Sequence, residues 1–327
     1  MKFTDFPKKD EVISSINRLN TTDFPKYNGK TNVKSFVENT TKMLTSEFGI
    51  ILNALKPLKQ KDFKLSIFRA REMDSFSNIN LVREHSYPPI HLTGMGRCNF
   101  PKYPVFYCSN DAMTALIEVV RNNGGSEKKY CLSKWEVHPT DQEFVFESFL
   151  QSDLPDENYF KVFKKEIRER INEPFEKRSK KKLDPERKDG LIEYLTFLDK
   201  SFINDNNYSL SASLAHRSLY ADHNFRTDIL MYPSVQTQFK GVNMALNPNF
   251  VENNLKLKRL YEVTIENYNP DKGEVKMTLH QYAEVEKNVM MWKKIIPNNE
   301  SYSQIIEDDF GHYITSQFKK KNNLPQQ

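Results

Sequence analysis

The chain is poor in cysteine, glycine and tryptophan, and it has no long apolar run. Among its 327 residues are only three cysteines, Cys98, Cys108 and Cys131, without paired spacing. A disulfide framework or a zinc site is therefore not expected. No apolar run approaches the roughly 20 residues of a membrane helix, and the first ten residues lack the apolar middle of a signal peptide. We expect a reduced, cytoplasmic, globular protein without membrane attachment.

Histidine and basic charge are also too limited to indicate a metal or nucleic-acid ligand. The seven histidines show no metal-ligand spacing, so no metal is expected. The net charge of +5 comes largely from lysine-rich runs at 177–182 and 319–321. Such runs can bind nucleic acid, but no stacking aromatics or base-reading motif accompany them. We interpret them as solvated surface or loop.

Hydrophobic periodicity predicts an α+β fold. Apolar residues keep helical spacing through the first sixty residues, so 1–60 is interpreted as an N-terminal helical accessory region. A further helix is expected at about 111–121, with Ser109 or Asn110 as its cap, and a helical stretch at about 156–207. Strand patterns occur at 65–71, 104–109, 130–138, 143–149, 228–235 and 242–246.

The C-terminal part of the chain predicts a β-hairpin. Apolar and polar residues alternate around Val263 and around Met277, and a turn sequence at 269–273 separates them. We therefore interpret 251–318 as a hairpin extension of the core. Residues 319–327 are expected to be a disordered tail.

A glycine–arginine loop is the most informative local feature. Two of the ten glycines, Gly94 and Gly96, come directly before Arg97. Glycine permits positive φ and close approach to a ligand, and arginine offers a charged planar fork suited to phosphate. A strand and an apolar helix with one acid, Glu118, follow. The pattern predicts a built site, although it is not a dinucleotide fingerprint, because it lacks the third glycine and the preceding strand.

Short motifs in a fixed order extend this site. They are Phe68-Arg69, Gly96-Arg97-x-Asn99, Tyr107-x-Ser109 leading to Glu118, and Tyr232-Pro233-Ser234-Val235 leading to Asn243. In this conjunction the chain resembles the RES domain family, named for its arginine, glutamate and serine. The resemblance covers about Leu65 to Asn249 and places a catalytic domain at 61–250, with 156–207 as an enlarged helical insertion.

The resemblance implies a fold similar to ADP-ribosyltransferase toxins, with NAD+ as the substrate. Family members break the nicotinamide–ribose bond by hydrolysis or phosphorolysis, and many are toxins with an antitoxin or immunity partner. The expected catalytic set is Arg69, Glu118 and Ser234. The expected cofactor-binding set is Arg97, Tyr107, Arg71, Asn99 and Asn243. Arg71 competes with Arg69, because strand alternation sends both to one face.

The residue types suit this chemistry. Two arginines can hold the NAD+ pyrophosphate through charge-assisted hydrogen bonds worth roughly 1.5–3 kcal/mol each. A carboxylate such as Glu118 can stabilise the oxocarbenium-like charge that develops on the ribose. Tyr107 could stack on nicotinamide. Ser234 could position the ribose or the attacking water or phosphate, and the sequence leaves this choice open.

Other interpretations stay open at this point. Singly, Arg69 could pair with a surface carboxylate, Glu118 could face solvent, Tyr107 could be a core residue and Ser234 a turn residue. The pocket could instead serve a protein mono-ADP-ribosyltransferase. A non-catalytic nucleotide-binding module is the alternative from another class, motivated by the long N-terminus and the insertion. The N-terminal helices could cover the cleft or form a homodimer surface, and typical toxin members are smaller than this chain.

Overall fold

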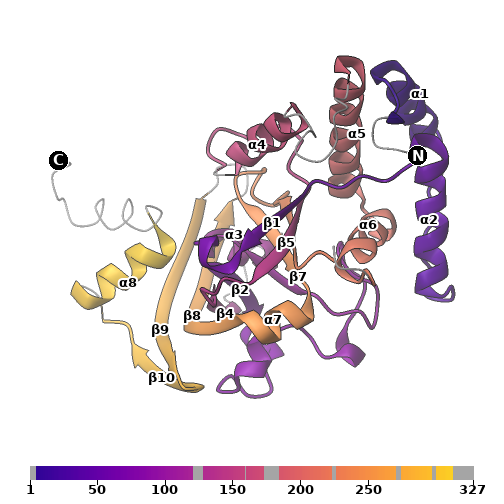
Figure 1. Cartoon of the computed structure of the whole chain (residues 1–327). Coiled ribbons are helices and arrows are strands. Elements are labelled where there is room, and N and C mark those ends of the chain that lie inside the picture. The colour runs from indigo at the N-terminus through magenta and orange to yellow at the C-terminus, as the bar shows by residue number, and fades with distance from the viewer. Residues whose placement is uncertain are drawn as a thin grey trace.

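The computed structural model describes residues 5–120, 128–158, 160–172, 184–222, 226–269, 274–296 and 300–311. One mixed sheet runs through these residues (Figure 1). Its strands are β1 (Leu55–Lys59), β2 (Ile67–Glu72), β3 (Phe106–Ser109), β4 (Lys128–Val137), β5 (Glu143–Ser148), β6 (Ile229–Pro233), β7 (Val242–Leu246), β8 (Leu255–Asn269), β9 (Glu274–Glu286) and β10 (Val289–Lys294). Their spatial order is β1-β5-β6-β7-β3-β2-β4-β8-β9-β10.

Helices cover this sheet, so the predicted α+β class is confirmed. They are α1 (Lys9–Asn20), α2 (Val33–Phe48), α3 (Ala112–Val120), α4 (Lys161–Asn172), α5 (Pro185–Asn204), α6 (Ser209–Leu219), α7 (Pro248–Asn254) and α8 (Glu300–Phe310). Short 3-10 turns lie at Gln60–Asp62, Met73–Ser75, Val82–His85 and Ile90–Leu92. Among the described residues, no helix combines the length and apolar character required for a membrane span.

The N-terminal helices form one layer with insertion helix α5 and the following helix α6. Helices α1 and α2 stand beside α5 and α6 at one end of the molecule (Figure 1). Aromatic contacts hold this layer together, with the ring of Tyr194 lying 5.5 Å from Phe6 and 4.9 Å from Phe48. The same apolar cluster reaches Leu230 of β6 and Ala245 of β7, so the layer packs directly on the sheet.

The helical interpretation of residues 1–60 is wrong at its C-terminal end. Helix α2 ends at Phe48, because Gly49 adopts φ +75° and its N–H donates to the Thr45 carbonyl at 2.8 Å. The chain then forms edge strand β1, which pairs antiparallel with β5. The N-terminal region therefore contributes a strand to the sheet.

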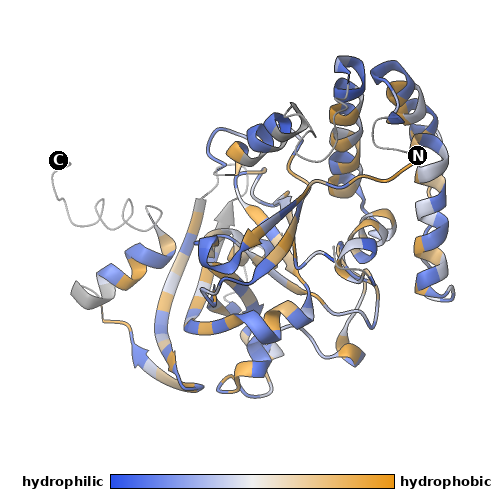
Figure 2. Cartoon of the chain, in the orientation of Figure 1, coloured by the Kyte–Doolittle hydropathy of each residue, from blue (hydrophilic) through white to orange (hydrophobic). Residues whose placement is uncertain are grey.

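Two smaller details of the prediction also change. Neither Ser109 nor Asn110 caps α3, because the Asp111 carboxylate accepts the N–H of Thr114 at 2.7 Å. The sequence resemblance extends only to about Asn249. The sheet continues beyond that point, because β8 pairs with the whole length of β4. Polar and apolar residues alternate visibly along β8 and β9 (Figure 2).

The predicted C-terminal hairpin is confirmed as the antiparallel pair of β8 and β9. Strand β10 and helix α8 follow it and were not predicted. Helix α8 packs on α3 through Ile306 and Phe310. The expected turn at 269–273 lies outside the described residues except for Asn269, which ends β8. The lysine runs at 177–182 and 319–321 and the tail at 319–327 also lie outside the described residues.

Candidate active site

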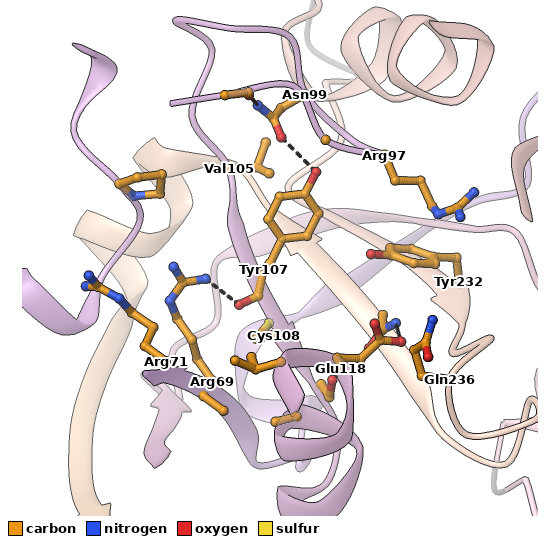
Figure 3. Close-up of a pocket in the computed structure, with 18 of the residues that line it drawn as sticks. Arg69, Arg71, Arg97, Asn99, Val105, Tyr107, Cys108, Glu118, Tyr232 and Gln236 are labelled. Carbon is orange, nitrogen blue, oxygen red and sulfur yellow. Dashed lines mark hydrogen bonds between the residues drawn. The ribbon is translucent and has the colours of Figure 1, made fainter. Parts of the chain in front are cut away.

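A pocket of about 700 Å³ opens where β2, β3, β6, β7 and α3 meet the glycine–arginine loop (Figure 3). Most of the residues predicted from the sequence line it, although they lie far apart in the chain. Those at its wall are Arg69, Arg71, Arg97, Asn99, Tyr107, Glu118 and Asn243. Ser234 lies directly behind this wall. The structure therefore brings the predicted residues together around one cavity.

Glu118 is held by hydrogen bonds from β7 and from the residue that follows β6. Its Oε1 accepts from the Ser234 hydroxyl at 2.6 Å and from the Asn243 side-chain amide at 2.6 Å. The Asn243 amide is itself oriented by the Ser109 hydroxyl, which donates to its Oδ1 at 2.8 Å. These donors fix the orientation of a carboxylate that projects from α3 into the pocket (Figure 3).

The structure changes the role expected for Ser234. Its side chain is fully buried, and its hydroxyl hydrogen goes to Glu118. Its Oγ also accepts the Thr237 N–H at 3.3 Å. Because this hydroxyl does not reach the pocket surface, it cannot contact a ribose, water or phosphate there. Ser234 is a positioning residue for Glu118.

Arg69 and Arg71 form a positive end of the pocket. They lie on one face of β2, as strand alternation predicted, and both line the cavity. Arg69 donates through Nη1 to the Tyr107 carbonyl at 2.7 Å, while its buried Nε has no hydrogen-bond partner. Burial, together with the charge of Arg71, lowers the pKa of Arg69 to about 10, so it stays charged at neutral pH.

Arg71 is more fully engaged than Arg69. Its Nη1 and Nη2 donate to the carbonyls of Glu84 and Ser75, and its guanidinium lies 4.3 Å from the Phe76 ring centroid. Within the described part of the chain, neither Arg69 nor Arg71 forms an ion pair with a carboxylate. A partly buried pair of cations that line a cavity and form no ion pair with a carboxylate is suited to an anionic ligand.

The glycine–arginine loop is built around the hydroxyl of Tyr107. This hydroxyl donates to Asn99 Oδ1 and accepts the Cys98 N–H, each at 2.8 Å. Gly96 and Asn99 exchange backbone hydrogen bonds of 3.0 and 3.3 Å. A Cβ on Gly96 would lie 2.6 Å from both Asn99 Oδ1 and Tyr107 Oη, whereas one on Gly94 would meet nothing within 4 Å. Close approach therefore requires glycine at 96.

Asn99 was predicted to bind the cofactor, but both the amide nitrogen and the oxygen of its side chain already form hydrogen bonds within the protein. Its side-chain amide donates to the carbonyls of Gly94 at 2.7 Å and Phe100 at 3.0 Å, and its oxygen accepts from Tyr107. The residue is buried. Asn99 shapes the loop, while the ring of Tyr107 lines the pocket.

Arg97 lines the pocket, where its cofactor-binding role stays a prediction, and it also contacts α5. Its Nη1 donates to the carbonyls of Phe202 and Ile203, the latter at 2.8 Å. These carbonyls belong to the last turn of α5, where acceptors lack helical partners and the helix dipole favours a cation. Figure 3 shows Arg97 across Tyr107 from Arg69 and Arg71. Arg97 links α5 to the glycine–arginine loop, while Arg69 and Arg71 form a separate pair of arginines in the pocket.

Three further pocket residues were not predicted as site residues. Tyr232 and Gln236 flank Glu118 in Figure 3 and belong to the segment around the Tyr-Pro-Ser-Val motif. Tyr208 directly follows the insertion, between α5 and α6. The motif itself was the available signal for Tyr232, whereas nothing in the sequence marks Tyr208.

Across the described residues there is no group of three or more histidine, cysteine, aspartate or glutamate side chains that could hold a metal ion. Burial raises the pKa of Cys98, which lies behind the loop, to about 12. The same cause raises the pKa of Cys108 and Cys131 above the ordinary thiol value. None of the three thiols is therefore activated as a nucleophile.

Comparison with known families identifies the fold. The family model described as the RES domain matches residues 68–265, which is more than half of the chain. The chain belongs to the RES domain family. A comparison with curated proteins gave no match. Membership is consistent with a toxin-like, NAD-related domain, and the family is linked to toxin–antitoxin systems. The match begins at β2 and ends within β8, so α1, α2, β1, β9, β10 and α8 lie outside it.

Proposed function

We propose that this protein cleaves the nicotinamide–ribose bond of NAD+, with water or inorganic phosphate as the acceptor. The observation that carries this proposal is the carboxylate of Glu118, oriented by Ser234 and Asn243, in the same pocket as Arg69 and Arg71. The pocket volume of about 700 Å³ is within the range of small-ligand sites.

The arrangement of the pocket suggests which residues bind each part of NAD+. The pyrophosphate binds at Arg69 and Arg71, because both residues line the cavity and make this end positive. The nicotinamide ribose then lies beside Glu118. As the C1′–N bond breaks, its electron pair moves to the nicotinamide nitrogen and the ring becomes neutral. Positive charge develops at C1′ and is stabilised by Glu118. A water or phosphate oxygen bonds to C1′, and attack by water releases a proton.

The direct test is nicotinamide release from NAD+ by the purified protein. ADP-ribose as the second product indicates hydrolysis, and a phosphorylated ADP-ribose that forms only with added phosphate indicates phosphorolysis. Glu118→Gln keeps the size of the side chain but removes its charge, so we expect a loss of about a hundredfold or more. Ser234→Ala should cause a smaller loss, because Asn243 still holds Glu118. A folded wild-type protein that releases no nicotinamide with or without phosphate would refute the proposal.

The same assay separates two other outcomes. With NAD+ labelled in its adenosine part, label on a macromolecule in a lysate would indicate protein ADP-ribosylation. Tight NAD+ binding without turnover would instead indicate a nucleotide-binding module. If the protein acts as a toxin, its expression should lower cellular NAD+ and arrest growth, and the Glu118→Gln variant should do neither.

A further inference from the structure

The connection between insertion helix α5 and helix α6 places one aromatic side chain in the pocket. Tyr208 connects α5 to α6 and lines the cavity, although it lies outside the motifs of the site. Its backbone has φ +61° and ψ 9°, the left-handed conformation that bulky residues rarely adopt. Such conformations persist where the surrounding structure imposes them, often at functional sites.

Hydrogen bonds on both sides of Tyr208 impose this conformation. The Asp205 carboxylate accepts the N–H and the hydroxyl of Ser211 at 2.8 and 3.0 Å. The Asn207 side chain accepts the Ser209 N–H at 2.9 Å, and the Ser209 hydroxyl accepts the Tyr27 N–H at 2.9 Å. The turn is therefore held by hydrogen bonds within itself and by one from the N-terminal segment. Together these bonds fix the direction of the Tyr208 side chain.

Arg97 fixes the ring from the opposite side. Its guanidinium lies 5.2 Å from the centroid of the Tyr208 ring, within cation–π range. The same guanidinium is held by the carbonyls of Phe202 and Ile203. Tyr208 is thus placed by two independent contacts, one from the insertion and one from the glycine–arginine loop.

The position of Arg97 assigns Tyr208 to one end of the pocket. In Figure 3, Arg69 and Arg71 lie on one side of Tyr107, while Arg97, Tyr232 and Glu118 lie on the other. A dinucleotide with its pyrophosphate at Arg69 and its scissile ribose at Glu118 must extend its nicotinamide away from the arginine pair. That direction leads to Tyr232 and Tyr208.

We propose that Tyr208 is a specificity-determining residue that, with Tyr232, binds the planar pyridine ring of the nicotinamide group. This inference rests on the proposed function. A flat aromatic platform accepts a flat heterocycle by stacking, and Tyr208 is already ordered for it. The connection between α5 and α6 thereby supplies part of the substrate site.

The test uses Tyr208→Gly and Tyr208→Phe in the full-length protein. Glycine adopts the left-handed backbone readily, so removing the ring in this way should not impair folding, and a thermal melt checks this. Inhibition of NAD+ cleavage by added nicotinamide and by added ADP-ribose reports the two ends of the pocket separately. For Tyr208→Gly we expect about tenfold weaker inhibition by nicotinamide. Inhibition by ADP-ribose should change by less than about twofold. Tyr208→Phe, which keeps the ring, should behave as wild type in both.

Unchanged nicotinamide inhibition in Tyr208→Gly, or an equal loss for both inhibitors, would overturn the inference while cleavage itself stands. Calorimetric binding of nicotinamide to Glu118→Gln, with and without Tyr208→Gly, measures the same site without turnover. Binding that disappears with the ring would support the nicotinamide site even if the wild type proved inactive on NAD+. Equal binding in the two proteins would refute it.

Discussion

A buried acid between the sheet and the helical layer should make stability depend on pH. Glu147 of β5 is only 1% exposed, and its Oε1 has no hydrogen-bond partner. Its Oε2 accepts the Thr227 hydroxyl at 3.0 Å. Burial raises the pKa of Glu147 from its ordinary value of 4.5 to about 7, and hydrogen bonds and the charge of Arg217 offset only part of this effect. The folded state therefore binds this proton more tightly than the unfolded state does.

The sign and size of the effect follow from this difference. Below pH 4.5 the acid is protonated in both states and stability is unaffected. As the pH rises from 4.5 to about 7, the unfolded state loses the proton first and the free energy of unfolding falls. At about 1.4 kcal/mol for each pH unit, the full loss above pH 7 is roughly 3 kcal/mol. Glu147→Gln removes this loss but places a buried amide there, at a cost of about 1 kcal/mol.

Urea unfolding of wild type and Glu147→Gln at pH 5, 6, 7 and 8 tests this reasoning. We expect the stability of the variant relative to wild type to rise up to about pH 7 and then level off, at about 2 kcal/mol in favour of the variant at pH 8. Glu143→Gln is the matched control, because the same change then falls at an exposed position of β5 and should leave the pH profile unaltered. Asp199 is another buried acid whose pKa is raised well above normal by burial. It is present in wild type and in both variants, so it contributes equally to the pH dependence of all three. A stability difference that stays constant from pH 5 to pH 8 would refute the argument.

Two further predictions concern the loop and the C-terminal helix. Gly96→Ala should lower the free energy of unfolding by about 1–3 kcal/mol and abolish most of the nicotinamide release, because its Cβ would displace the Tyr107 hydroxyl. Gly94→Ala is the control and should be neutral in melting and activity assays, because its Cβ meets no atom within 4 Å. Asp309→Asn should destabilise the protein by about 3–5 kcal/mol in urea unfolding, because this buried carboxylate binds Lys134 at 2.5 Å and Arg259 at 2.9 Å. The same change at exposed Asp308 should have no effect; an equal loss there would contradict this explanation.

Much of the sheet and the acid of the pocket could be predicted from local sequence. Alternation within β2 correctly placed Arg69 and Arg71 on one face, and helical spacing identified the helix of Glu118. Edge strand β1 was missed because its apolar residues continue the spacing of α2, although Gly49 and Pro57 mark the break. Helix α8 was missed because Asp309, its buried anchor, has its partners on distant strands.

The differences between the predicted and the observed site have a common physical cause. A sequence motif specifies the type of a residue, but it does not specify which groups that residue contacts in the fold. Arg97 occurs in a sequence suited to phosphate, yet its nearest acceptors are carbonyls at the end of α5, more than a hundred positions later. Ser234 follows a turn-forming proline, yet its hydroxyl donates a hydrogen bond to Glu118 of α3. In both cases the side chain acts on the pocket through another group. An insertion can therefore give a motif arginine a new structural contact without changing the motif. Arg97→Lys keeps the charge but loses the planar guanidinium that contacts Tyr208. We therefore expect it to weaken inhibition of NAD+ cleavage by nicotinamide more than inhibition by ADP-ribose.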